Sequence, residues 1–122
     1  MTTKPPVRVV ATPHFARTFK RLRKKYRHIE TDLKPLVEQL QQGETPGDQI
    51  QGTGYTVYKE RLPSTDAQRG KSGGYRVIYY MKTQNFIYLI EIYPKSERED
   101  ISSAELSALL TEVQTELSGD NE

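Results

Sequence analysis

The 122-residue chain contains no cysteine, no tryptophan and only two histidines, His14 and His28. Without cysteine it can form neither a disulfide framework nor a thiol nucleophile, and two histidines are too few for a stable zinc site made of protein ligands alone. The sequence offers no convincing serine, histidine and aspartate set and no carboxylate cage, so a catalytic triad or a two-metal mechanism has little support. Any catalysis must therefore use lysine, arginine and tyrosine, and we expect no metal and no small-molecule cofactor.

Long apolar runs are also missing. No stretch approaches the length of a membrane span, and the start, Met-Thr-Thr-Lys-Pro-Pro, lacks the apolar core of a signal peptide. We therefore expect a cytoplasmic protein with no membrane contact. Hydrophobic residues make up only 34%, but eight tyrosines and three phenylalanines argue against general disorder. We expect a single domain over residues 1–122, with its core at about 7–117, a loose arm at 1–6 and an acidic tail at 118–122.

Charge is distributed unevenly along the chain. Residues 1–95 hold 17 lysines and arginines against eight acids, a net charge of +9, whereas residues 96–122 hold one arginine against eight acids, a net charge of −7. A basic body of this kind indicates a surface that binds a polyanion. The acidic end is either kept away from that surface or folded across it as a competitor, and the sequence leaves both arrangements open.

The N-terminal part predicts a short strand at 7–10 and two helices in a hairpin. Thr12 can cap the first helix, Pro13 suits its first turn, and an apolar stripe follows at helical spacing. The second helix is predicted at about 31–41, with Gly43 as its stop.

The other positions of the first helix are nearly all basic, with no acid among them. Like charges at this spacing destabilise a helix, and an ordinary solvated face mixes both signs. We interpret these residues as contacts to nucleic acid, with a plain solvated surface as the alternative. They are Arg17, Lys20, Arg21, Arg23, Lys24, Lys25 and Arg27.

Three strands are predicted at 55–62, 74–82 and 86–93, followed by a closing helix at 102–117. The fold class is therefore α+β, in which an antiparallel sheet of about four strands packs against the helix hairpin, with a C-terminal helix added. The long loop before the second of these strands carries Arg69 and Lys71 among glycine and serine residues. We expect these two cations to contact RNA.

Cations also stand on the predicted strands. Side chains alternate across a strand, so Lys59 and Arg61 share one face while Glu60 points the other way. Arg76 lies in the next strand among apolar and aromatic residues. Such a cluster indicates a phosphate-bearing polymer such as RNA, and the alternative is a set of charges that protects an exposed strand edge.

Three segments together resemble the RelE toxins of the RelE/ParE superfamily: Tyr-Lys-Glu-Arg-Leu at 58–62, Gly-Tyr-Arg-Val-Ile-Tyr at 74–79, and Ile-Tyr-Pro-Lys-Ser-Glu-Arg at 92–98. Ile-Gln-Gly-Thr-Gly at 50–54 and the lysine-containing loop are most similar to the HigB-type branch. The resemblance covers about residues 8–112. It implies the RelE-like microbial ribonuclease fold, and a bacterial toxin of a toxin–antitoxin pair that cuts messenger RNA in the A site of the 30S ribosomal subunit and so inhibits translation. Its partners would be a cognate antitoxin, the ribosome and mRNA.

Carried over by position, the resemblance assigns catalysis to Lys59, Arg61 and Arg76. Ser96 and Ser102 stand where the best-known members have an arginine and a tyrosine. Candidates to replace those two groups are Lys95, Arg98 and Tyr93.

The implied chemistry is attack of a ribose 2′-hydroxyl on its own phosphate, without a metal, which leaves a 2′,3′-cyclic phosphate. Arg61 and Arg76 are suited to clamp the phosphate, because arginine does not release its proton. Crowding by like charge favours a neutral Lys59 amine, which makes Lys59 the predicted proton acceptor. Two other functions stay open: a ParE-like inhibitor of DNA gyrase on the same fold, and a noncatalytic RNA-binding module.

Overall fold

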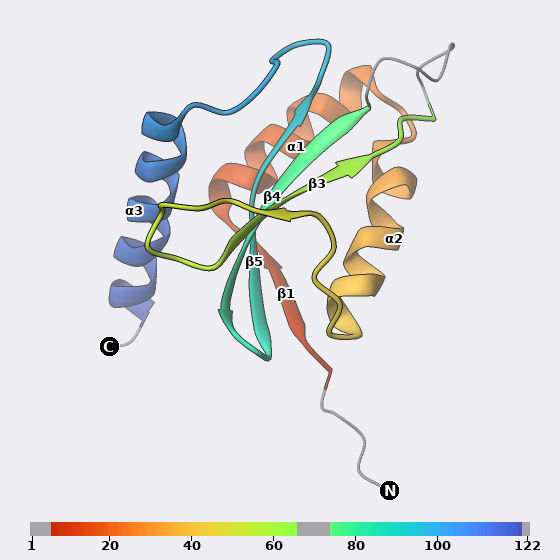
Figure 1. Cartoon of the computed structure of the whole chain (residues 1–122). Helices are drawn as coiled ribbons and strands as arrows, with labels where there is room; N and C mark the ends of the chain where they lie inside the picture. The colour runs from red at the N-terminus through yellow and green to blue at the C-terminus, as the bar shows by residue number, and fades with distance from the viewer. Residues whose placement is uncertain (1–5, 66–73, 121–122) are drawn as a thin grey trace, which may run out of the picture.

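A computed structural model describes residues 6–65 and 74–120, with side chains as far as residue 115. Figure 1 shows a sheet with helices on both of its faces. The elements in chain order are β1 (Arg8–Ala11), α1 (Pro13–Lys25), α2 (Ile29–Gln41), β2 (Asp48–Gln49), β3 (Val57–Leu62), β4 (Tyr75–Thr83), β5 (Phe86–Pro94) and α3 (Ser103–Asp120). The predicted α+β fold is confirmed.

The sheet has five strands in the order β1-β5-β4-β3-β2. Strands β3, β4 and β5 pair antiparallel, as predicted; β2 pairs antiparallel with β3, and β1 runs parallel to β5. The expected count of about four strands missed β2, which lies between the second helix and the first of the three predicted strands. A strand of two residues has no periodicity to detect, and the direction of β1 depends on a partner more than 70 residues away in the chain.

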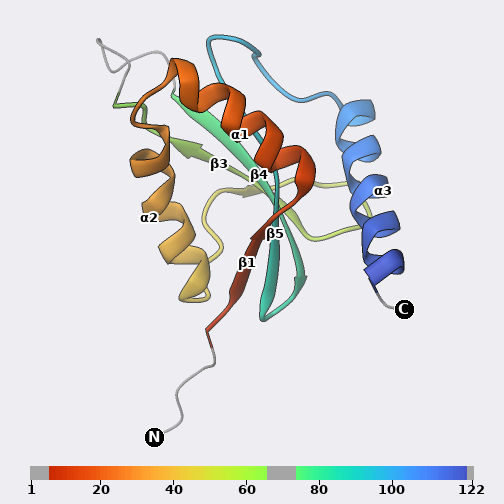
Figure 2. The ribbon, with the colours of Figure 1, turned by 180° about the vertical axis from the view of Figure 1, so that it is seen from behind.

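Two apolar clusters lie on opposite faces of the sheet. Helices α1 and α2 cover one face, which is turned toward the viewer in Figure 2, and the larger cluster fills the space between them and the sheet. Helix α3 covers part of the other face, where Leu106, Leu110 and Val113 pack on Val57 and Ile78. The central strands β4 and β5 therefore present apolar side chains to both faces of the sheet.

Helix α1 begins where its capping residues predict. The hydroxyl of Thr12 accepts a hydrogen bond from the Phe15 N–H at 3.2 Å and donates one to the Leu89 carbonyl oxygen at 3.1 Å. The cap therefore ties the helix start to β5 as well as to its own first turn. Pro13 occupies the first turn, where its missing N–H has no intrahelical partner to lose.

A bulge interrupts β5. Ile78 is opposite Glu91 and Tyr79 is opposite Leu89, so Ile90 is an extra residue in the ladder. Simple alternation would place Ile90 and Ile92 on the same face, but Ile90 joins the α3 side and Ile92 joins the side of α1 and α2.

Candidate active site

The cations predicted to meet on the sheet lie on the face that α3 partly covers. Arg61 on β3 is opposite Arg76 on β4, and Arg76 is opposite Tyr93 on β5. Facing residues of neighbouring strands point to the same side, so these three side chains form a row across the sheet. Lys59 lies two residues before Arg61 on the same face.

Burial differs along this row. Arg61 is exposed, whereas Arg76 is only 7% exposed and Tyr93 only 3%. An Nη1 atom of Arg76 donates to the Tyr75 carbonyl oxygen at 3.4 Å. A buried charge needs polar partners, so we expect the surrounding residues to fix the Arg76 side chain in place. The Arg61 side chain on β3 faces solvent.

Lys59 has a negatively charged neighbour that the sequence did not predict. Its Nζ lies 3.0 Å from Oδ1 of Asp100, a residue of the segment between β5 and α3. The same oxygen accepts the phenolic hydrogen of Tyr93 at 3.1 Å and the Ile101 N–H at 2.8 Å. Lys59 is therefore not surrounded by cations alone, and the like-charge crowding expected to make it a proton acceptor is offset by this carboxylate.

The acidities of Tyr93 and Asp100 are shifted in opposite directions. Burial, followed by the hydrogen bond to the Asp100 carboxylate, raises the pKa of Tyr93 to about 12. Partial burial alone would raise the pKa of Asp100, but hydrogen bonds from Lys59, the Ile101 N–H and Tyr93 outweigh it, and that pKa is lowered. Near neutral pH the tyrosine is thus a hydrogen-bond donor and the aspartate is an anion.

Arg98, a predicted catalytic residue, is engaged in ion pairs with two acids. Its Nη2 lies 3.0 Å from Oε2 of Glu91, and its Nη1 lies 2.9 Å from Oε2 of Glu105. The guanidinium also stacks on the Tyr93 ring, with 4.4 Å between Cζ and the ring centroid. Glu91 is only 4% exposed and has a further contact of 2.9 Å with Nε2 of His14. Arg98 therefore neutralises a buried carboxylate and holds its own segment against the sheet.

The other candidates near the end of β5 have local roles. Lys95 donates from Nζ to the Glu99 carbonyl oxygen at 3.1 Å. Ser102 caps α3: its hydroxyl accepts the Glu105 N–H at 3.1 Å, while the Glu105 carboxylate accepts the Ser102 N–H at 3.2 Å. Ser96 is exposed. Neither serine therefore supplies the group that the best-known family members have in its place.

Part of the basic surface of α1 is neutralised by acids from other elements. Arg23 pairs with Glu30 of α2, at 3.7 Å, and Arg17 pairs with Glu112 of α3, at 3.9 Å. Arg21 and Lys25 both approach Glu97, at 3.7 and 3.3 Å. Within the described residues, Lys20, Lys24 and Arg27 are exposed and take part in no ion pair. Arg69 and Lys71 lie outside the described residues.

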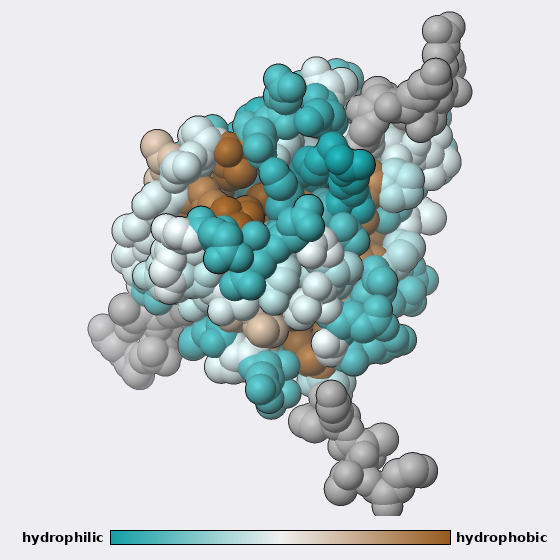
Figure 3. Space-filling model, viewed as in Figure 1, coloured by the Kyte–Doolittle hydropathy of each residue, from teal (hydrophilic) through white to brown (hydrophobic). Residues whose placement is uncertain are grey.

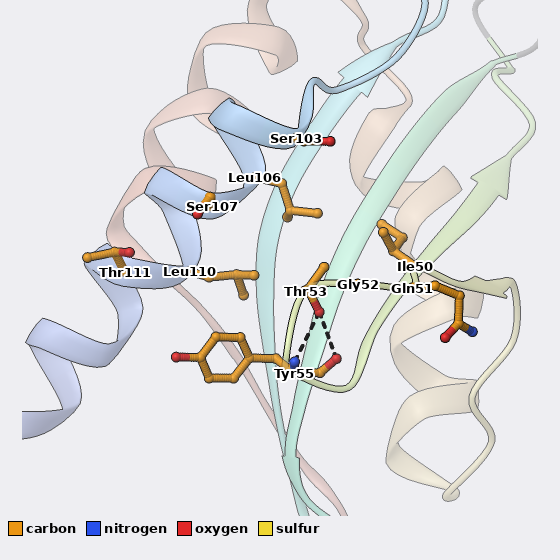
Figure 4. A pocket seen from close by; sticks show the side chains of 10 residues that line it. All are labelled: Ile50, Gln51, Gly52, Thr53, Tyr55, Ser103, Leu106, Ser107, Leu110 and Thr111. Atoms are coloured by element: carbon orange, nitrogen blue, oxygen red, sulfur yellow. Dashed lines mark hydrogen bonds between the residues drawn. The ribbon is translucent and has the colours of Figure 1, made fainter.

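A hollow of about 400 Å³ opens between α3 and residues 50–55 (Figure 4). Ile50, Leu106 and Leu110 supply its apolar lining, and the Thr53 hydroxyl beside it is occupied by the Tyr55 backbone. Its lining includes no charged side chain, so it lacks the cations that pair with phosphate. In Figure 3, hydrophilic side chains cover most of the same side of the molecule, with hydrophobic ones in small patches between them.

In the part of the chain that the structure describes, no group of three or more histidine, aspartate or glutamate side chains could hold a metal ion. None of the helices described is both long and apolar enough to cross a membrane. Among known protein families, residues 12–120 match the one described as the RelE toxin of the RelE / RelB toxin-antitoxin system.

Proposed function

The chain belongs to the RelE toxin family, and we propose that it cleaves messenger RNA in the A site of translating ribosomes. Membership makes it the toxin of a toxin–antitoxin system, with an antitoxin as its partner, and toxins of this family are in general mRNA-cleaving enzymes. Ribosome dependence, the A site and a cytoplasmic place of action are the parts that we propose. Catalysis without a metal and the residue roles described below are also part of the proposal.

The observation that carries this proposal is the row formed by Arg61, Arg76 and Tyr93 on three neighbouring strands. Two guanidinium groups can bind the phosphate oxygens and stabilise the charge that develops on them as the 2′-hydroxyl attacks. They do so as permanent cations, because arginine keeps its proton.

Tyr93 is the proposed proton donor to the leaving 5′-oxygen. With a pKa of about 12 its phenol is protonated near neutral pH, and it faces Arg76 directly. Lys59 is the proposed proton acceptor for the 2′-hydroxyl. It can take that role only when its ion pair with Asp100 is broken. The product would be a 2′,3′-cyclic phosphate on one fragment and a 5′-hydroxyl on the other.

The test is to map mRNA ends after adding the purified protein to a translating extract and, in parallel, to the same RNA without ribosomes. We expect cuts in codon register that appear only during translation. Arg61→Ala should reduce them at least about 100-fold, since it removes a phosphate clamp. Lys34→Ala, which removes an exposed cation on α2, is the matched control and should cut like the parent.

Intact messages with an active extract would overturn the proposal. A DNA supercoiling assay with purified gyrase then separates the ParE-like alternative from a noncatalytic RNA-binding module. Cuts that appear equally without ribosomes would retain the nuclease but contradict ribosome dependence.

A further inference from the structure

Three hydrogen-bond donors converge on a single oxygen atom of Asp100. They are the ammonium of Lys59, the phenol of Tyr93 and the main-chain N–H of Ile101, at 3.0, 3.1 and 2.8 Å from Oδ1. Such a set of donors, one of them charged, is what an anionic oxygen requires. These three donors form an anion-binding site, and the Asp100 carboxylate of the same chain occupies it.

Asp100 is carried by residues 95–102, which we call the strap; in Figure 1 the strap is the blue loop from β5 to α3. The strap is fixed on both sides of Asp100. Before it, Glu97 accepts hydrogen bonds from Lys25, the last residue of α1, and from Tyr26 directly after it, at 3.3 and 3.1 Å. Arg98, also before it, pairs with Glu91 and Glu105. After it, Ser102 caps α3. These contacts place the carboxylate over the end of the sheet where Lys59 and Tyr93 lie.

We propose that Asp100 occupies the position of an RNA phosphate oxygen, so that the strap holds the toxin in a self-occupied state and substrate binds only as the carboxylate leaves. This inference rests on the proposed function, because it concerns regulation of the same site. Lys59 and Tyr93 are the two groups assigned above to proton transfer, and both are engaged by one carboxylate oxygen.

The alternative that Asp100 is itself the proton acceptor is disfavoured by its surroundings. The three hydrogen bonds to Oδ1 stabilise the charged carboxylate and lower its pKa, which makes the whole carboxyl group a weaker base. Exposure favours displacement instead. The side chain of Asp100 is 58% exposed, so it can return to water without leaving a buried charge, and exposed ion pairs are weak.

The test measures binding of a short single-stranded RNA whose attacking 2′-hydroxyl is replaced by hydrogen, so that it cannot be cleaved. Fluorescence anisotropy of the labelled RNA would report affinity for the parent, Asp100→Asn and Glu99→Gln. Both variants remove one negative charge from the strap, but the side chain of Glu99 takes part in no ion pair within the described residues. Any effect of net charge alone is therefore the same in both variants.

We expect Asp100→Asn to bind the RNA about 10-fold more tightly than Glu99→Gln. In a Lys59→Met background the advantage of Asp100→Asn should disappear, since the competing ion pair is already gone. Equal affinity of Asp100→Asn and Glu99→Gln would overturn the inference. Asp100→Ala is the second variant, and thermal unfolding of all of them checks that each one folds.

Cleavage in the translating extract keeps the two proposals separate. Tighter binding by Asp100→Asn without any cleavage by the parent would leave self-occupancy standing and remove the nuclease. Cleavage by the parent with unchanged RNA binding in Asp100→Asn would support the nuclease and overturn self-occupancy. Unchanged binding together with abolished cleavage in Asp100→Asn would identify Asp100 as a catalytic carboxylate and overturn the inference.

Discussion

Gly47 lies directly against the main chain of Lys59. A Cβ atom at position 47 would be 2.4 Å from the Lys59 carbonyl oxygen, and Gly47 has a φ of +98°. The next residue, Asp48, pairs with Lys59 in the ladder between β2 and β3. The close approach of this edge strand to the lysine therefore depends on a residue without a side chain.

Gly47→Ala should lower the free energy of unfolding by at least about 3 kcal/mol, since it combines an unfavourable φ with a clash against backbone. Gly43→Ala is the matched control, because Gly43 has a similar φ of +92° and no atom within 4 Å of the added Cβ. We expect it to cost about 1 kcal/mol. Urea unfolding of both variants is the measurement, and equal losses would contradict the packing argument.

Arg98→Ala is expected to act on stability. It leaves Glu91, which is 4% exposed, with His14 as its remaining ion-pair partner among the described residues. Removing one partner of a buried charge costs about 3 kcal/mol or more. Arg23→Ala, which breaks an exposed pair with Glu30, should cost less than about 1 kcal/mol. A loss of cleavage by Arg98→Ala at unchanged stability would instead support direct contact with RNA.

The raised pKa of Tyr93 predicts a loss of stability at alkaline pH. An unfolded tyrosine ionises near its ordinary pKa of 10.0, whereas in the folded state the value is about 12. Below pH 10 both states keep the proton. Between pH 10 and 12 the unfolded state loses it first, so the free energy of unfolding falls as pH rises through this window.

Tyr93→Phe removes this group and should weaken that dependence. The measurement is the free energy of unfolding of parent and variant at pH 8 and pH 11. We expect the difference between the two pH values to be smaller in the variant. Tyr55→Phe, which removes an exposed phenol, is the control. A parent and a Tyr93→Phe variant with the same pH dependence would contradict the prediction.

The exposed cations of α1 predict an effect on ribosome binding. The double variant Lys20→Glu with Lys24→Glu should weaken binding and flatten its salt dependence, by about 0.7 in the slope of log K on log salt for each phosphate that the protein no longer neutralises. Lys34→Glu on α2 makes the same kind of charge change at a different surface. A double variant whose slope matches that of the parent would leave the basic face as a plain solvated surface.

Local sequence patterns were sufficient to predict most of the helices and strands. Thr12 and Pro13 mark the start of α1, and the larger strands and α3 end within a few residues of their predicted limits, because each carries a strong apolar period between turn residues. Strand alternation also placed Lys59 and Arg61 on one face, since the ladder between β3 and β4 is regular. The split of Ile90 and Ile92 between the two faces was not predictable, because one inserted residue changes no composition.

The part of the site that the sequence did not predict involves residues far apart in the chain. Asp100 is 41 residues from Lys59, and no spacing rule relates a strand residue to a residue in an irregular segment. Arg98 was predicted to be catalytic as a candidate to replace a group that the best-known family members have and this chain lacks. In the structure it pairs with Glu91 and Glu105, and no local sequence pattern relates these three residues.

Because basic and acidic residues are separated along the chain, they emerge from the ribosome at different times during synthesis. Lys59, Arg61, Arg76 and Tyr93 leave the ribosome before Asp100 and before the acids that pair with α1 from the strap and α3. Until then the nascent chain is a polycation beside ribosomal RNA, and the α3 side of its sheet lacks the helix that completes the second apolar cluster. The strap and α3, which are translated after these strands, thus both cover this apolar face and neutralise part of the basic surface of α1.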